Sequence, residues 1–241
     1  MRRALIVIGK APVAGSAKTR LAPPLSAEDA ADLYRGFLLD TLDMASILGW
    51  EGTRVIHPRG DGPALANLLA HMRVELLEQR ATGLGDALAF AFERAFADGY
   101  DTAILIGSDN PTLPARPAQD AWRALQAGAD LAIGPTLDGG YYLIGMREPH
   151  LGVFADIEWS TPRVYQQTLK RARQLDLRVQ SVAEWYDVDE PADLERLSRE
   201  VAEAPAQVAR HTREVLERLS AAATPARAES ASRPSARRTC G

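Results

Sequence analysis

Cysteine, histidine and long apolar runs are all scarce in this sequence. Its single cysteine, Cys240, stands beside the C-terminal glycine, which excludes an internal disulfide and a cysteine-based metal site. The four histidines form no pattern, and serine or cysteine nucleophile signatures are also missing. No run of about 18 apolar residues could cross a membrane, and the apolar residues 4–8 are too few for a signal peptide core. We therefore expect a cytoplasmic protein without a membrane span.

An excess of positive charge is also lacking. The formal net charge is −4, whereas a dedicated nucleic-acid binder normally carries a basic stripe. Hydrophobic residues make up 46% and charged residues 25% of the 241 residues, the usual balance of a globular protein that needs no disulfides. From about residue 221 only Ala, Ser, Pro and Arg dominate, and such a segment buries too little apolar surface to fold. The expected organisation is one domain at 1–200, an additional helix at 201–220 and a disordered tail at 221–241.

Short apolar runs alternate with amphipathic segments along the chain. Ser26 followed by Asp29 is typical of a helix N-cap. Strands are predicted at 4–8, 53–57, 74–78, 103–106, 131–133, 140–145 and 178–182, with helices between most of them. This alternation predicts an α/β fold, a three-layer α/β/α sandwich around a mostly parallel sheet. Ligands bind such sheets at the carboxyl ends of the strands, so functional residues are expected directly after each strand.

The loop after the first strand is rich in glycine, proline and cations. Lys10, Gly15, Lys18 and Arg20 all fall between residues 9 and 25. Glycine lets backbone N–H groups approach an anion closely, and Lys or Arg neutralises phosphate charge. The spacing matches neither a Walker A loop nor the G-x-G-x-x-G fingerprint. Composition alone leaves two interpretations open, a nucleotide-phosphate site and an ordinary polar loop.

Aspartates follow two further predicted strands. Asp109 comes directly after residues 103–106, where a carboxylate could bind Mg²⁺ together with substrate phosphate oxygens or could cap a turn. Asp187 and Asp189 project the same way if their segment is extended, which suits a second metal contact. For Asp189 the favoured interpretation is a cap on the helix that Pro191 opens.

The segment from Asp138 to Tyr141 has two interpretations as well. Asp138-Gly139-Gly140 is a turn signal of hairpin type. The paired glycines also leave room for a ligand against the backbone, in which case Asp138 would point into a cleft. Tyr141 could stack on a base or pack in the sheet, and packing is the commoner fate of such a side chain.

Together these segments resemble one bacterial family of transferases. The motifs are Lys10-Ala-Pro, Lys18-Thr-Arg-Leu21, Ile106-Gly-Ser-Asp109, Asp138-Gly-Gly-Tyr-Tyr, Glu158-Trp-Ser-Thr161 and Trp185-Tyr-Asp-Val-Asp189. In this order they are similar to the arsenosugar-biosynthesis-type glycosyltransferases of the GT-A (nucleotide-diphospho-sugar transferase) fold. The resemblance covers about residues 3–197. Molybdopterin and phospholactate guanylyltransferases share this type of fold.

The resemblance implies a role for each motif. Lys18 and Arg20 would contact donor phosphates. Asp109 would hold a divalent metal, and Asp187 would complete the metal site. Asp138 would face the acceptor or the donor sugar. Two positions depart from the family pattern, because Asn110-Pro111-Thr112 stands where Cys-Pro-Asp is common and Ala87 where an arginine is common. The second departure weakens any claim of an additional phosphate clamp.

The expected activity is therefore transfer of a sugar from a nucleotide-sugar to a small acceptor, with Mg²⁺ or Mn²⁺ as cofactor. The alternatives are nucleotidyl transfer from an NTP with release of pyrophosphate, and an inactive nucleotide-binding module. In either reaction the leaving group is a phosphate-bearing anion that positioned cations stabilise. We expect Lys18 and Asp138 to be catalytic, Asp138 by orienting or deprotonating an acceptor hydroxyl. Gly139, Gly140 and Tyr141 are expected to line the substrate cleft.

Overall fold

The computed structural model describes residues 1–80 and 83–223 and contains one seven-stranded sheet. The strand order is β3-β2-β1-β4-β6-β5-β7, and β6 alone runs antiparallel to its neighbours. The strands are β1 (Arg3–Ile8), β2 (Gly52–His57), β3 (Glu75–Glu78), β4 (Thr102–Gly107), β5 (Leu131–Pro135), β6 (Tyr141–Met146) and β7 (Val179–Ser181). The predicted mostly parallel sheet is confirmed.

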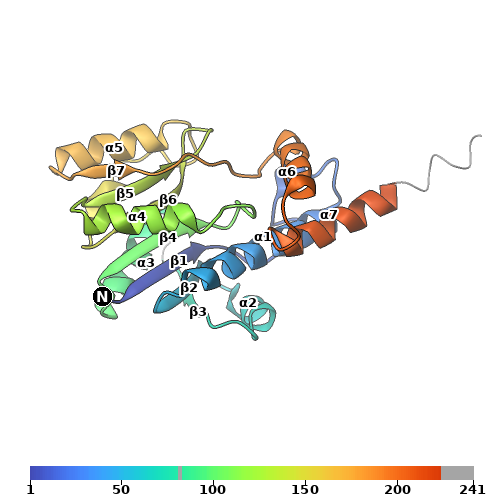
Figure 1. The fold of residues 1–241 in the computed structure, drawn as a ribbon, viewed down its shortest axis with the longest axis horizontal. Helices are drawn as coiled ribbons and strands as arrows, with labels where there is room; N and C mark the ends of the chain where they lie inside the picture. The colour runs from blue at the N-terminus through green and yellow to red at the C-terminus, as the bar shows by residue number, and fades with distance from the viewer. Residues whose placement is uncertain (81–82, 224–241) are drawn as a thin grey trace, which may run out of the picture.

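Helices cover both faces of the sheet (Figure 1). They are α1 (Ala27–Leu48), α2 (Gly62–Leu68), α3 (Leu84–Ala97), α4 (Arg116–Gln126), α5 (Val164–Gln174), α6 (Pro191–Glu203) and α7 (Arg210–Ala223), with two short 3₁₀ helices, η1 (Thr19–Leu21) and η2 (Leu151–Phe154). Ser26 accepts a hydrogen bond from the Asp29 N–H at 3.0 Å, so the predicted N-cap is confirmed. None of the helices in the described ranges combines the length and hydropathy that a membrane span needs.

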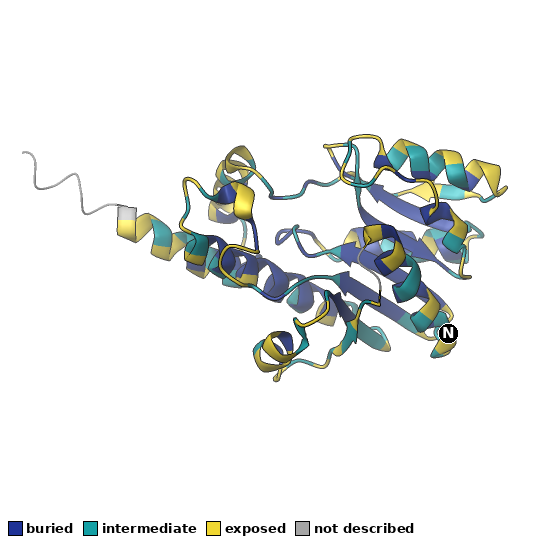
Figure 2. Ribbon diagram, turned by 180° about the vertical axis from the view of Figure 1, so that it is seen from behind, coloured by how far each residue is buried: buried dark blue, intermediate teal, exposed yellow. Residues whose placement is uncertain are grey.

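Alternation along β1 builds the two halves of the core. Leu5 and Val7 face a cluster that also contains Leu38 of α1, whereas Ala4 and Ile6 face α3 on the opposite side. Successive side chains of a strand point to opposite faces, so a strand that is apolar throughout must be covered on both. Figure 2 shows the result, a buried sheet between helices whose outer faces are exposed. The three-layer prediction is therefore confirmed.

A third apolar cluster joins the C-terminal helices to α1. Phe37 of α1, Leu197 of α6 and Val215 of α7 belong to it, and α6 and α7 lie beside α1 outside the sheet (Figure 1). The Asp40 carboxylate accepts hydrogen bonds from the N–H groups of His211 and Thr212, where α7 begins. The sequence predicts the additional helix at 201–220, whereas α7 begins at Arg210 and continues to Ala223, and residues 201–203 belong to α6. Residues 224–241 of the predicted tail lie outside the described residues.

The strand order creates one place for a site. β1 connects through α1 to β2 on one side, while β4 lies on its other side, so the loops after β1 and β4 diverge at the carboxyl edge. Because β6 is antiparallel to β4, Leu143 pairs with Ile106 and the start of β6 comes to the same edge. The Val188 N–H donates to the Asp109 carbonyl at 3.0 Å, which adds the segment before α6.

Candidate active site

Two adjoining cavities open at this edge of the sheet. The first, here called the basic cavity, has a volume of about 470 Å³ and extends past Lys10 to Gln79. The second, here called the aromatic cavity, has a volume of about 510 Å³ and extends past Asp138 to Trp159. Both volumes suit a small-molecule ligand. The charged groups that line both cavities are Arg20, Asp109, Asp187 and Asp189.

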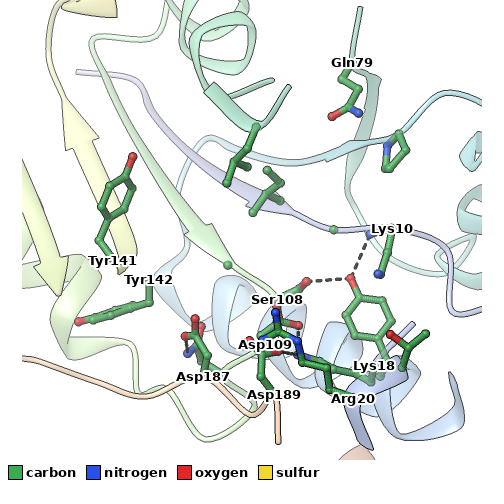
Figure 3. Close-up of a pocket in the computed structure, with 18 residues that line it drawn as sticks. Lys10, Lys18, Arg20, Gln79, Ser108, Asp109, Tyr141, Tyr142, Asp187 and Asp189 are labelled. Atoms are coloured by element: carbon green, nitrogen blue, oxygen red, sulfur yellow. Dashed lines mark hydrogen bonds and ion pairs between the residues drawn. The ribbon is translucent and has the colours of Figure 1, made fainter. Parts of the chain in front are cut away.

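Lys18 is held between two of these carboxylates. Its ammonium lies 2.6 Å from Asp109 Oδ1 and 2.8 Å from Asp189 Oδ1, and its side chain is only 5% exposed. Burial lowers the pKa of Lys18, but the two carboxylates more than offset it and the pKa is raised. Figure 3 shows the ammonium at the foot of the basic cavity, directed at the aspartates. A direct contact of Lys18 with donor phosphates would require it to exchange these partners.

Asp189 belongs to the site, contrary to the sequence interpretation as a helix cap. The N-cap of α6 is Glu190, which forms a capping box with Asp193. Asp189 contributes its backbone N–H to this arrangement, donating to Asp193 Oδ2 at 3.1 Å. Its own carboxylate is thereby left to face Lys18. Sequence periodicity places the helix start correctly near Pro191 but does not tell which of two adjacent acidic residues caps it.

Asp187 is the most perturbed carboxylate of the cleft. Its pKa is raised to about 7, mainly by burial and also by the negative charges of Asp109, Asp189 and Asp138, while a hydrogen bond from Asn110 lowers it. Asn110 Nδ2 lies 2.6 Å from Asp187 Oδ1 and 2.6 Å from the Tyr186 carbonyl oxygen. Asn110 was not among the predicted site residues, although its place directly after the strand-end aspartate was the available signal.

The donor set of the cleft fits a hard divalent cation. The cleft provides carboxylate oxygens, which Mg²⁺ prefers, from Asp109, Asp187 and Asp189. A bound cation would reduce the repulsion among these negative charges. Asn110 Oδ1 is buried beside them without a hydrogen-bond partner. Within residues 1–80 and 83–223, a tighter group of ligand atoms exists only elsewhere, between α1 and α7, where Asp40, Asp43 and His211 come within 4.8 Å of one another.

The basic loop contributes unequally to the cleft. Arg20 lines both cavities, and within the described ranges its guanidinium has no hydrogen-bond or ion-pair partner. Lys10 lines the basic cavity, with its ammonium 2.7 Å from the Ser16 carbonyl oxygen. Gly15 does not line either cavity and occupies an exposed turn with φ +76°. Arg20 and Lys10 are thus the two cations of the loop that are not engaged by carboxylates.

Tyr34 of α1 links the two loops. Its hydroxyl oxygen lies 3.0 Å from the Lys10 backbone nitrogen, whose N–H donates to it, and 2.8 Å from Ser108 Oγ. Burial raises its pKa to about 12, so the hydroxyl stays protonated. The sequence predicts only an amphipathic helix here, and no local pattern singles out one tyrosine on its buried face.

The Asp138 turn combines both sequence interpretations. Asp138 Oδ1 accepts hydrogen bonds from the Thr136 hydroxyl and from the Gly140 N–H, which is the turn geometry. Asp138 and Gly140 also line the aromatic cavity. Gly139 does not line it; a Cβ there would overlap the Pro162 carbonyl oxygen, and φ is +90°, so this glycine is required by the close approach of backbone. The position therefore belongs to the turn.

Tyr141 forms part of the wall between the two cavities. Its ring packs edge-on against Trp159 with the centroids 6.4 Å apart. Burial raises the pKa of its hydroxyl. The tyrosine thus packs, which is its commoner fate, and it also lines both cavities. Figure 3 shows it among the residues of the basic cavity.

Comparisons with known proteins place the chain among transferases. A family model described as an uncharacterized protein conserved in bacteria (DUF2064) matches residues 45–161. The chain is 30% identical to a phosphoenolpyruvate guanylyltransferase of Sphaerobacter thermophilus over 76% of its length and 87% of the relative. It is 29% identical to a 2-phospho-L-lactate guanylyltransferase of Methanocorpusculum labreanum over 75% of its length and 76% of the relative.

A solved structure gives the same picture at the level of the fold. A protein of Desulfovibrio desulfuricans G20, provisionally described as a nucleotide-diphospho-sugar transferase, is 34% identical, with a TM-score of 0.82 over 92% of this chain and 96% of that protein. The predicted transferase fold is confirmed, whereas the arsenosugar-specific family is not. The DUF2064 model matches slightly less than half of the chain, and the chain belongs to the same family as the phosphoenolpyruvate guanylyltransferase of Sphaerobacter thermophilus.

Proposed function

We propose that this protein is a divalent-metal-dependent nucleotidyltransferase, which transfers a nucleoside monophosphate from an NTP to a small acceptor and releases pyrophosphate. The observation that carries the proposal is the junction of the two cavities, where Arg20, Asp109 and Asp187 line both. Two substrates bound in adjoining cavities would meet at these groups. The two curated relatives described above are guanylyltransferases, which favours nucleotidyl transfer over the sugar transfer expected first from the sequence.

In the proposed reaction the polyphosphate lies in the basic cavity. An acceptor oxygen forms a bond to the α-phosphorus of the NTP. The bond between that phosphorus and the oxygen that bridges it to the β-phosphorus breaks. The electron pair leaves with pyrophosphate. Lys10 and Arg20 stabilise the negative charge that develops on this leaving group. Unit charges about 4 Å apart interact by about 4 kcal/mol at an effective dielectric near 20, which corresponds to roughly three decades of rate if realised only in the transition state.

The acidic groups have a complementary role. Asp109 and Asp187, with Asp189 beside them, would hold the divalent cation, which supplies Lewis-acid stabilisation of phosphate charge when bound. Lys18 positions Asp109 and Asp189 through its two ion pairs. Asn110 orients Asp187 through its amide. No covalent nucleophile is required, because the acceptor attacks directly.

Sugar transfer from a nucleotide-sugar remains the second candidate. It is favoured by the 34% identity to the protein provisionally described as a nucleotide-diphospho-sugar transferase. The two reactions leave different products, since sugar transfer releases a nucleoside diphosphate. An inactive binding module would release neither.

One assay separates these outcomes. The protein is incubated with Mg²⁺ or Mn²⁺, the four NTPs or nucleotide-sugars, and a panel of acceptors, and both pyrophosphate and nucleoside diphosphate are measured. We expect pyrophosphate. Nucleoside diphosphate alone would favour sugar transfer, and tight nucleotide binding without either product would favour a binding module.

Asp109→Asn is expected to keep the fold but to lose metal-dependent NTP binding, because it removes a charged ligand at the junction of the cavities. The affinity for Mn²⁺ and NTP is measured by calorimetry, with circular dichroism as the check on folding. Asp156→Asn is the matched control, since Asp156 is an exposed carboxylate outside the cavities. Equal Mn²⁺ affinity of Asp109→Asn and the wild type would contradict the assignment.

A further inference from the structure

The aromatic cavity differs from the basic cavity in its charge. Among the described residues that line it, Arg20 is the sole cation, and Arg20 is shared with the basic cavity. The carboxylates of Asp109, Asp187 and Asp189 are shared as well. Among the described residues, Asp138 is the one charged group that lines the aromatic cavity and not the basic cavity, and its charge is negative. A ligand in the aromatic cavity therefore meets no cationic side chain among the described residues other than Arg20, which also faces the polyphosphate site.

Apart from the Asp138 carboxylate, the wall of this cavity that is not shared through charged groups is apolar or carries hydroxyl groups. Trp159 and Tyr141 present an edge-to-face aromatic pair, and Leu88 and Val164 add aliphatic surface. Aromatic and aliphatic side chains favour a ligand with an apolar face. The polar groups that belong to this wall are Asp138, Thr136, Ser160 and Thr161. These groups suit hydrogen bonds with hydroxyls.

An acceptor with two anionic groups does not fit this wall. Phosphoenolpyruvate and 2-phospho-L-lactate, named for the relatives' reactions, each carry a phosphate and a carboxylate. If the phosphate attacked at the junction, the carboxylate would lie in a cavity whose own charged group is Asp138. Like charges about 4 Å apart repel by about 4 kcal/mol at an effective dielectric near 20. Burial of a charge without a partner adds to this penalty.

We propose that the acceptor of this protein is an uncharged alcohol with an apolar face, of the sugar or polyol class, bound against Trp159 and Tyr141. The inference rests on the proposed nucleotidyl transfer. The acceptor O–H attacks the α-phosphorus, a phosphodiester forms, and pyrophosphate leaves with the electron pair of the broken bond. The alcohol proton passes to the Asp138 carboxylate and from there to solvent, to which Asp138 is exposed. The balance is NTP and alcohol to phosphodiester, pyrophosphate and one proton.

The test compares two sets of acceptors with the full-length protein, Mg²⁺ and the preferred NTP. One set contains neutral pentoses, hexoses and polyols, and the other contains phosphoenolpyruvate and 2-phospho-L-lactate. We expect pyrophosphate release with the neutral set and no detectable binding of phosphoenolpyruvate by calorimetry in the presence of a non-hydrolysable NTP. Pyrophosphate release with the anionic set alone, or tight binding of phosphoenolpyruvate, would overturn this inference and leave nucleotidyl transfer standing. If no acceptor in either set leads to pyrophosphate release, the result contradicts nucleotidyl transfer itself, and this inference fails with it.

Variants of Trp159 test where the acceptor binds. Trp159→Ala is expected to raise KM for the neutral acceptor about 10-fold or more, because the aromatic wall is lost. Trp159→Phe keeps a ring, so its KM is expected to stay within about 3-fold of wild type. KM for the NTP is expected to be unchanged in both, which separates loss of a binding wall from loss of the fold. Equal effects on the two substrates would contradict the placement of the acceptor.

Discussion

The ionisation of Asp187 makes the stability of the folded protein depend on pH. Its pKa is raised from 3.8 to about 7, first by burial and then by neighbouring negative charge. The folded state therefore holds this proton more tightly than the unfolded chain does. The contribution to stability is present at low pH, and it is lost as pH rises from about 4 to about 7. The upper bound of this loss is about 4 kcal/mol.

Asp187→Asn should remove this loss. The amide keeps an oxygen that can accept the Asn110 hydrogen bond while it carries no charge. In the presence of EDTA at pH 8 we expect the variant to exceed the wild type in free energy of unfolding by about 1–3 kcal/mol, with the difference vanishing near pH 4. Urea unfolding at both pH values measures this. If the variant is no more stable than the wild type at pH 8, the ionised Asp187 carboxylate does not destabilise the folded state.

The connection between β5 and β6 holds one wall of the aromatic cavity against the start of α5. The Gly139 carbonyl accepts a hydrogen bond from the Tyr165 N–H at 2.9 Å. Gly139 itself lies at φ +90°, and a Cβ there would overlap the Pro162 backbone. Backbone contacts thus join the turn before β6 to the start of α5.

Gly139→Ala is expected to disrupt this junction. The strained φ alone costs about 1 kcal/mol, and the overlap with Pro162 adds to it because backbone cannot move aside as a side chain does. Gly15→Ala is the matched control, since φ there is +76° and an added Cβ would meet no atom within 4 Å. Thermal unfolding should therefore show a clearly larger fall in Tm for Gly139→Ala. Equal falls in the two variants would mean that the close approach to Pro162 does not matter.

The cleft is assembled from segments far apart in the chain. The loop after β1, the loop after β4, the start of β6 and the segment before α6 converge on it. Ion pairs of Lys18 with Asp109 and Asp189 join three of these segments. A ligand that bridges them should therefore stabilise the whole folded molecule.

Nucleotide and metal together should raise Tm. Binding to the folded state alone contributes about 2.7 kcal/mol at 100 times Kd, which for a domain of this size corresponds to roughly 5–11 °C. We expect this shift with the preferred NTP plus Mg²⁺, a small shift with either alone, and none for the pair in excess EDTA. Differential scanning fluorimetry measures it, and Asp109→Asn is expected to abolish the synergy. A shift equally large in EDTA would contradict a metal bridge between protein and phosphate.

The sequence by itself determined the fold and the edge of the sheet at which function had to be sought. Apolar runs such as the one in β1 require cover on both faces, and that requirement follows from local pattern alone. The strand-end placement of Asp109 and the cations after β1 is likewise a matter of position along the chain. These features depend on neighbours in sequence, which is why they could be predicted.

Only the tertiary structure decided how the charges pair. Lys18 and Asp189 are 171 residues apart, and Asn110 and Asp187 are 77 apart, so no local pattern encodes their contacts. The same holds for Gly139, whose need for glycine comes from Pro162 in another element. Charge pairing and close approach are set by distance in space, and that distance exists only after the strands have taken their order in the sheet.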